Sequence, residues 1–262
     1  MKAIILAAGM GTRLGKYTEN LPKGMLKFAG KSLIERQLGV LKASGVEDIV
    51  IVKGYAPDKI NFPGVKYFVN EDFANTNMVE TLFCAESEMT EDFIVCYSDI
   101  LYEKRVLGAV LKTQCNIGVT VDIDFKEYWN ARLAKPEEDS ESLSIGSEGN
   151  IIELGSPNPK LEQISGRYVG IIKFAGKGVD DLKRVYHDQK NKYYCSDKPW
   201  LNSKSFKKGY MTDILQAIIN AGTRVDPIKI KRGWLEFDTV EDYELYQKWM
   251  EDGDMRKFVV FE

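Results

Sequence analysis

The segment from Leu6 to Met25, LAAGMGTRLGKYTENLPKGM, contains residue types that bind phosphate groups. Gly9 and Gly11 permit positive φ angles and a close backbone approach, so successive N–H groups can surround a phosphate. Arg13 adds a forked donor that matches phosphate oxygens. Lys23 follows a proline, which restricts the backbone and helps to hold the lysine in place. The segment therefore predicts an anion-binding loop.

Two common glycine loops do not match this segment. A Walker P-loop has the pattern GxxxxGK[ST], whereas the lysine here follows Pro22. A dinucleotide-binding fingerprint needs GxGxxG and an acidic residue at the end of the second strand. Leu14 takes the third glycine position and Lys53 ends that strand. The alternative to a phosphate site is a glycine-rich turn with incidental charges.

Two aspartates are candidate metal ligands. Asp99 follows a buried run, IVCY, and Asp238 follows a late run, WLEF. Ligands of open parallel sheets bind beyond the carboxyl ends of the strands, so Asp99 should lie at the same rim as Gly9. Mg²⁺ prefers oxygen ligands and usually takes one or two carboxylates plus substrate phosphates. The structural alternatives are a turn residue at Asp99 and a helix N-cap at Asp238.

The composition limits the chemistry and the partners. His187 is the only histidine in 262 residues and lies in a polar run, so a solvated helix-end residue explains it better than a hydrolase triad. The net charge of −3 argues against nonspecific nucleic-acid binding. No apolar run approaches the ~20 residues that span a bilayer. We expect a cytoplasmic protein with no nucleic-acid or membrane partner; the oligomeric state stays open, a homodimer included.

The elements that must position these residues begin with a strand–helix–strand unit. Lys2 to Ala8 and Asp48 to Lys53 are continuous apolar runs, typical of strands buried on both faces. Between them, Ser32 and Glu35 form a predicted capping box for a helix from Leu33 to Ser44. The crossover should be right-handed.

The alternation of strands and helices continues to about residue 120 and predicts a mostly parallel sheet with helices on both faces. The strands are expected at Val65–Val69, Asp92–Tyr97 and Asn116–Asp122, and the helices at Met78–Met89 and Glu103–Lys112.

After residue 120 the pattern changes. Polar clusters and short extended stretches from Asp124 to Ser165 predict antiparallel hairpins over one edge of the sheet. We expect one Rossmann-like α/β domain over 1–262, with a nucleotide-binding half (1–120), an acceptor-binding half (121–262) and a hairpin insertion over the active site. The later strands are expected at Arg167–Ala175, Arg224–Ile230 and Trp234–Phe237, and the helices at Val179–Asn191, Tyr210–Ala221 and Thr239–Asp252.

The glycine-rich segment also resembles a family signature. Nucleotidyltransferases that join an NTP to a phosphorylated small molecule carry the pattern LAAGxGTRLxxxTxxxPKxM, which matches here without a gap, Thr18 included. The resemblance implies a Mg²⁺ site and attack of an acceptor phosphate on the α-phosphorus, with release of pyrophosphate. It implies Lys23 and Arg13 as catalytic residues and Asp99 and Asp238 as the metal pair. The nucleotide contacts are expected at Leu6, Ala8, Gly9, Gly11, Thr12 and Arg13.

Elementary chemistry agrees with this reaction. A phosphate monoester has a second pKa of ~6, so the nucleophile is already largely ionised at neutral pH. No general base is required, which suits a chain with one histidine. Two anions must be brought together, and a metal ion with fixed cations can do this.

A narrower resemblance covers VNEDFANTNMVETLF (Val69 to Phe83), YSDILY and GWLEFDTVEDYE. These segments are similar to phosphocholine-type cytidylyltransferases of bacterial surface-glycan modification. In that group the segment after the second βα unit lines the base, which makes Asn75, Asn77 and Glu80 candidate base contacts for CTP. Alternatively, the two asparagines build a turn and a helix cap.

The acceptor site is expected in the run DIDFKEYWNARLAKPEEDSES, residues 122–142. An aromatic pair would hold a quaternary ammonium group. Carboxylates would hold a primary amine, and an arginine would hold the α-carboxylate of phosphoglutamine. A solvated hairpin with a core tryptophan is the structural alternative. The substrate-binding candidates are Trp129, Arg132, Asp139 and Glu141.

These observations together favour a Mg²⁺-dependent cytidylyltransferase that transfers CMP from CTP to a small phosphorylated acceptor carrying an amine or an amino acid. Two alternatives stay open. One is a hexose-1-phosphate nucleotidyltransferase that uses UTP or dTTP. The other is a nucleotide sensor on the same fold without catalytic activity.

Overall fold

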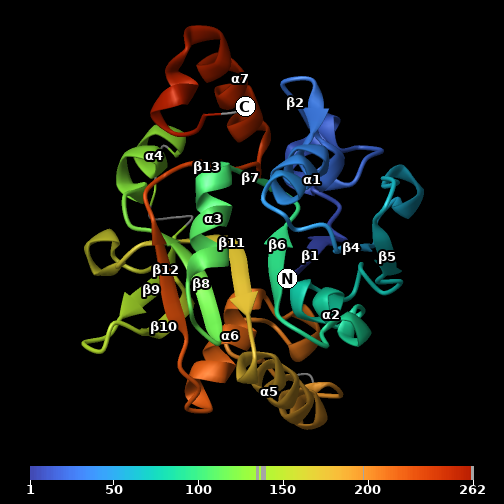
Figure 1. Ribbon diagram of the computed structural model, residues 1–262, viewed down its shortest axis with the longest axis vertical. Helices are drawn as coiled ribbons and strands as arrows, with labels where there is room; N and C mark the ends of the chain where they lie inside the picture. The colour runs from blue at the N-terminus through green and yellow to red at the C-terminus, as the bar shows by residue number, and fades with distance from the viewer. Residues whose placement is uncertain (134–135, 137–139, 197, 261–262) are drawn as a thin grey trace.

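The computed structural model describes residues 1–133, 136, 140–196 and 198–260. A seven-stranded sheet in the order β12-β8-β11-β6-β1-β4-β5 forms its centre (Figure 1). Neighbouring strands are parallel except at β11, which runs antiparallel to both β6 and β8. This confirms the predicted mostly parallel mixed sheet. The strands are β1 (Lys2–Ala7), β4 (Ile49–Lys53), β5 (Lys66–Val69), β6 (Phe93–Tyr97), β8 (Ile117–Asp122), β11 (Arg167–Phe174) and β12 (Asp226–Ile230).

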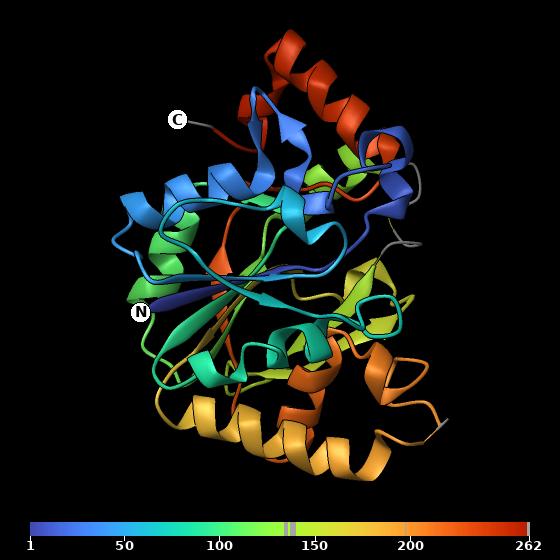
Figure 2. The ribbon, with the colours of Figure 1, turned by 90° about the vertical axis from the view of Figure 1, so that its right-hand side faces the viewer.

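Helices cover both faces of the sheet (Figure 2). α1 and α3 lie on one face, and α2, α5 and α6 lie on the other. Every residue of β1, β6 and β8 is buried, as expected for apolar strands between two helical layers. None of the described helices is long and apolar enough to cross a bilayer. The helices are α1 (Leu33–Ala43), α2 (Met78–Phe83), α3 (Lys104–Lys112), α4 (Phe125–Arg132), α5 (Lys177–Tyr193), α6 (Met211–Asn220) and α7 (Val240–Asp252).

Short strand pairs complete the fold. β13 (Trp234–Glu236) pairs with β7 (Ile100–Tyr102) just beyond the end of β6, so it brings the late part of the chain to the loop that follows β6. β2 (Lys27–Phe28) and β3 (Lys31–Ser32) form a small hairpin before α1. The predicted capping box of α1 is present, because the side chains and backbones of Ser32 and Glu35 bond each other reciprocally.

The predicted run of hairpins from Asp124 to Ser165 is partly wrong. A hairpin is formed by β9 (Glu141–Ile145) and β10 (Ile151–Pro157), but residues 125–132 form the helix α4. Phe125, Tyr128 and Trp129 follow helical spacing and are all buried. Tyr128 packs against Trp234 and Tyr246, and Trp129 packs against Trp234, in an aromatic cluster. Burial of this apolar face outweighs the polar residues around it.

The predicted helix from Met78 to Met89 is too long. α2 ends at Phe83, and a 3₁₀ turn follows at Glu86–Glu88. Glu88 accepts a hydrogen bond from the buried Lys2 ammonium at 2.8 Å, so the chain turns toward β1. Both Ala85 and Met89 remain fully buried, which is why the apolar spacing did not reveal the break.

Candidate active site

The loop after β1 folds its lysine back onto its glycines. Gly11 has φ +68°, and a Cβ atom there would lie 3.0 Å from Cβ of Lys23. The Thr18 hydroxyl donates to the Gly11 carbonyl at 2.7 Å, and the Lys23 N–H donates to the Gly9 carbonyl at 3.4 Å. The signature residues therefore brace one another, and they aim Lys23 at the carboxyl end of β1.

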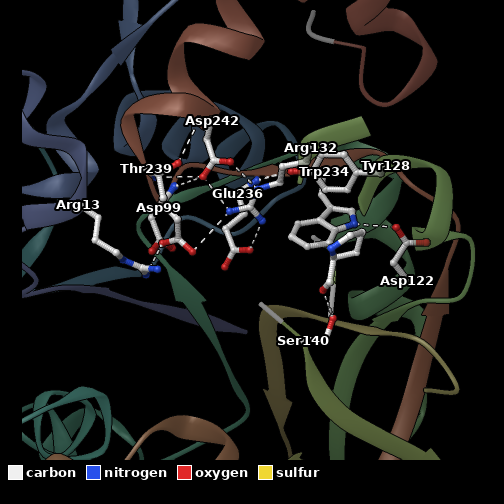
Figure 3. A network of polar contacts seen from close by, with 12 residues as sticks. Arg13, Asp99, Asp122, Tyr128, Arg132, Ser140, Trp234, Glu236, Thr239 and Asp242 are labelled. Atoms are coloured by element: carbon white, nitrogen blue, oxygen red, sulfur yellow. Dashed lines mark hydrogen bonds and ion pairs between the residues drawn. The ribbon is translucent and has the colours of Figure 1, made fainter. Parts of the chain in front are cut away.

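Lys23, Asp99 and Asp238 converge at this rim, as the sequence predicts. The Lys23 ammonium donates to Oδ2 of Asp99 at 2.5 Å and also to Oδ1 of Asp238. All three side chains are at most 13% exposed. Arg13 lies on the open side, with Nη2 3.2 Å from Oδ1 of Asp238 (Figure 3).

The electrostatics keep Lys23 and Asp238 charged. Burial by itself would raise the pKa of Asp238, but the positive charges of Lys23 and Arg13 outweigh burial and lower that pKa to about 2. Burial also opposes the charge on Lys23, and the two carboxylates overcome it and raise the lysine pKa above its usual value. Lys23 is therefore a fixed cation at neutral pH and not a proton acceptor.

The two aspartates fit a magnesium ion completed by substrate. Oδ1 of Asp99 is buried and has no hydrogen-bond partner among the described residues. Carboxylate oxygens are ligands that Mg²⁺ prefers. Within the same residues no group of three or more His, Cys, Asp or Glu side chains forms a metal cage. The donor set therefore suits an ion that also takes phosphate oxygens and water.

A buried ionic network holds the backbone at Asp238. Asp242 accepts hydrogen bonds from the backbone N–H groups of Asp238 at 2.9 Å and Thr239 at 3.0 Å. Arg132 holds Asp242 with two bonds of 2.7 and 2.8 Å and Glu236 with a third of 2.7 Å (Figure 3). Thr239, rather than Asp238, is the N-cap of α7. The capping alternative for Asp238 is therefore wrong.

This network corrects the expectation for Arg132. Its side chain is 1% exposed, and its Nε, Nη1 and Nη2 donate to Asp242 and Glu236. It positions the loop of Asp238 and has no free fork for an acceptor carboxylate. Burial raises the pKa of Glu236 to about 7, with a further rise from Asp238 that Arg132 and Arg167 oppose.

The structure gives a different outcome for each of the other three acceptor candidates. Trp129 is 1% exposed in the aromatic cluster, so it presents no face to a quaternary ammonium group, and the core alternative is correct. Burial dominates because its ring packs against Tyr128 and Trp234. Glu141 begins β9 and is half-buried. Asp139 lies outside the described residues.

A small pocket of about 110 Å³ opens beside the Lys23 ammonium. Asn77, a candidate base contact, lines it together with the candidate loop residues Leu6, Ala8 and Gly9. A larger cavity of about 440 Å³ between α1 and α3 shares no residue with it and lies away from the charged trio. The small pocket is lined by Leu6, Ala8, Gly9, Lys23, Phe73, Thr76, Asn77, Met78, Thr81, Tyr97, Ser98 and Asp99.

Two predicted base contacts do not line this pocket. Asn75 is exposed and donates to Asp72 within a turn, as the structural alternative proposed. Glu80 faces α5, where it accepts from the hydroxyl of Tyr186 at 2.8 Å. The turn of α2 places Asn77 and Thr81, four residues apart, on the pocket side and Glu80 on the other.

Several residues that line the pocket were not predicted from the sequence. Thr76 and Thr81 both accept hydrogen bonds of 2.9 Å from the buried amide of Asn70, which fixes the start of α2. Tyr97 and Ser98 immediately precede Asp99 and could have been inferred from that position. Thr12 is exposed at the start of a 3₁₀ turn.

Comparison with known proteins agrees with this geometry. Residues 3–124 match the family model of the MobA-like NTP transferase domain. A CTP:phosphoglutamine cytidylyltransferase from Campylobacter jejuni is 32% identical over 257 residues, which cover 94% of this chain and 98% of that protein. A choline-phosphate cytidylyltransferase from Streptococcus pneumoniae is 37% identical over 107 residues, or 39% of this chain and 47% of that protein.

A solved structure shares the fold over almost the whole length. The CTP:phosphocholine cytidylyltransferase from Streptococcus pneumoniae covers 95% of this chain and 98% of its own, with a TM-score of 0.72 at 22% identity. Together with the full-length relative at 32% identity, this confirms the resemblance that the glycine-rich signature indicated. The chain is an enzyme of the nucleotidyltransferase family and has cytidylyltransferases among its relatives.

Proposed function

We propose that this enzyme transfers CMP from CTP to a small phosphorylated acceptor that carries an amine or an amino acid, with release of pyrophosphate. The observation that carries the proposal is the meeting of Lys23 with Asp99 and Asp238 beside a small pocket at the ends of β1 and β6. A buried cation flanked by two carboxylates suits a reaction between two anions.

Different residues bind the triphosphate, stabilise the developing charge and hold the metal ion. The loop amides around Gly9 and Gly11 and the exposed Arg13 bind the triphosphate. An acceptor phosphate oxygen forms the new bond to the α-phosphorus, and the bond from that phosphorus to pyrophosphate breaks. Lys23 stabilises the charge that builds up on these oxygens and stays protonated. Asp99 and Asp238 would hold Mg²⁺, which neutralises phosphate charge when bound.

The choice of cytidine and of a nitrogen-bearing acceptor rests on the relatives. The two relatives described above are cytidylyltransferases by name, for phosphoglutamine and for choline phosphate. The phosphoglutamine enzyme matches along the acceptor half as well as the nucleotide half, which favours an amino-acid acceptor. We place the CMP-activated product in surface-glycan modification, as the narrower sequence resemblance implies.

A pyrophosphate-release assay tests the proposal. The purified enzyme is given Mg²⁺, one of CTP, UTP or dTTP, and one of phosphoglutamine, phosphocholine, 2-aminoethylphosphonate or glucose 1-phosphate. We expect release with CTP and a nitrogen-bearing acceptor. Release only with UTP or dTTP and the sugar phosphate would replace this function with the hexose alternative. Nucleotide binding without release in any combination would support the sensor alternative.

A further inference from the structure

Two arginines approach the ring of Trp129, and they differ in what else they bind. The guanidinium carbon of Arg132 lies 4.8 Å from the ring centroid and that of Arg167 lies 4.0 Å away. Arg132 is saturated by Asp242 and Glu236. The Arg167 side chain makes no hydrogen bond or ion pair with the described residues, and its Nε is buried without a partner. A buried donor without a partner is costly and needs an explanation.

The fold presents Arg167 at the rim of the active site. Arg167 begins β11 and pairs with Asp122, the last residue of β8. Because β11 is antiparallel to β6, its first residues lie at the edge where β6 leads into Asp99. Gly170, at φ +81°, lies within an irregularity of β11 and packs against the ring of Tyr97, where a Cβ would come within 2.7 Å. This bend fixes the direction in which the start of β11 enters the rim.

The described neighbours of Arg167 support its guanidinium without forming an ion pair with it. The ring of Trp129 is 1% exposed and packed within the aromatic cluster, so it supports the flat guanidinium group. The charge of Arg167 acts on Glu236, so it is close to the acidic side of the site. Glu236 is already bonded by Arg132 at 2.7 Å. Arg167 therefore keeps donors available for a ligand.

The position of Arg167 indicates which anion it would meet. Arg13 and Arg132 lie on opposite sides of Asp99 (Figure 3). They also approach different oxygens of Asp238, with Nη2 of Arg13 3.2 Å from Oδ1 and Nη2 of Arg132 3.6 Å from Oδ2. Arg13 and Lys23 serve the reacting phosphates on one side, whereas Arg167 belongs with Arg132 on the other. An acceptor whose phosphate reacts beside Lys23 would extend the rest of its structure toward Arg167. A planar guanidinium matches a carboxylate with two parallel hydrogen bonds.

We propose that Arg167 binds the α-carboxylate of an amino-acid acceptor and thereby selects such acceptors over cationic ones such as phosphocholine. This inference rests on the proposed function and names the acceptor class for the same site. Arg167 takes the role that the sequence analysis gave to Arg132. A quaternary ammonium group would meet the charge of Arg167, with which no described side chain forms an ion pair, and be repelled.

Steady-state kinetics of Arg167→Gln test the inference, with pyrophosphate release as the readout. We expect KM for phosphoglutamine to rise by about 10- to 100-fold, the loss of a charge-assisted bidentate contact. KM for CTP should stay unchanged, and KM for phosphocholine should not rise. Arg167→Lys keeps the charge without the fork and should be intermediate. Arg184→Gln changes a half-exposed arginine of α5 and is the matched control. It should leave KM unchanged for phosphoglutamine and for CTP.

Other results would overturn the inference. These are an unchanged KM for phosphoglutamine, an equal rise for both acceptors, or a change in KM for CTP. If Arg167→Gln does not fold, the wild type decides, because phosphoglutamine should bind at least tenfold better than its α-carboxamide analogue, and equal values refute the role. A wild type that uses only phosphocholine refutes the inference but keeps the proposed function. No release with any acceptor removes both.

Discussion

The region that we propose to bind the phosphates (the phosphate side) and the region that we propose to bind the rest of the acceptor (the acceptor side) are built differently. On the phosphate side, Gly9, Gly11 and Lys23 come from one loop of fifteen or so residues that is braced by its own hydrogen bonds. On the acceptor side, Arg132, Arg167 and Glu236 come from α4, β11 and β13, which meet only in the folded protein. A local loop can be maintained by a short motif, whereas the acceptor side depends on how distant elements pack.

The same contrast separates the two arginines on Trp129. Arg132 is buried and fully bonded, so it serves structure. Arg167 lies on the same ring but makes no hydrogen bond or ion pair within the described part of the chain, and we therefore propose that it serves recognition. Residue type alone does not distinguish these roles, because the difference lies in how many acceptors surround each guanidinium. Variants of the two regions test whether structural and ligand-binding roles are separated in this way.

The largest effect is expected on the structural arginine. Arg132→Met leaves Asp242 and Glu236 buried without their cation, so the free energy of unfolding should fall by about 3–5 kcal/mol. Urea denaturation measures the loss, and Arg184→Met on the exposed part of α5 is the control, expected to change stability by about 0.5 kcal/mol or less. A loss below that of the control would show that the network does not hold the acceptor side together.

The next effect concerns the phosphate side. Lys23→Ala removes a fixed charge beside the reacting phosphates, so turnover should fall by ~10²–10³. The assay is pyrophosphate release, with a thermal melt to show that the variant is folded. Lys16→Ala changes an exposed lysine of the same loop, 68% exposed, and should keep wild-type turnover. Near wild-type turnover in Lys23→Ala would reject its role.

A glycine pair separates backbone strain from ligand binding. Gly11→Ala and Gly149→Ala both place alanine at positive φ, +68° and +77°, so each should lose about 1–2 kcal/mol of stability. Only at Gly11 does the new Cβ press on Lys23, 3.0 Å away, whereas nothing lies within 4 Å at Gly149. KM for CTP, measured by titration, should rise in Gly11→Ala alone. An equal rise in both variants would contradict the self-braced loop.

The smallest effect on stability comes from a pair of neighbouring residues that separates capping from metal binding. Thr239→Ala removes the N-cap of α7 and should cost about 1 kcal/mol of stability while activity is retained. Asp238→Asn should do the reverse, with a folded protein that has lost Mg²⁺-dependent release. Melting curves and activity are compared for the two variants. Activity retained in Asp238→Asn would leave Asp99 without its proposed partner.

Much of the fold followed from local patterns. The continuous apolar runs of β1, β4 and β6 are buried as predicted, and the capping box of α1 is in place. The errors fall where a local pattern competes with distant packing. The polar stretch around α4 did not look helical, because its burial depends on Trp234 and Tyr246, more than a hundred residues away.

The sequence by itself determined the phosphate side of this protein. Lys23 and Asp99 could be chosen in advance, because the signature loop after β1 and the end of β6 must meet at one edge of a parallel sheet. Asp238 follows β13, outside that sheet, and its choice came from the family resemblance. Only the tertiary structure decided that Arg132 bonds Asp242 and Glu236 and that Glu80 faces α5. It also decided that Arg167 has no hydrogen-bond partner for its Nε among the described residues. The availability of a charged side chain depends on which groups surround it in space, and neighbours along the chain do not reveal that.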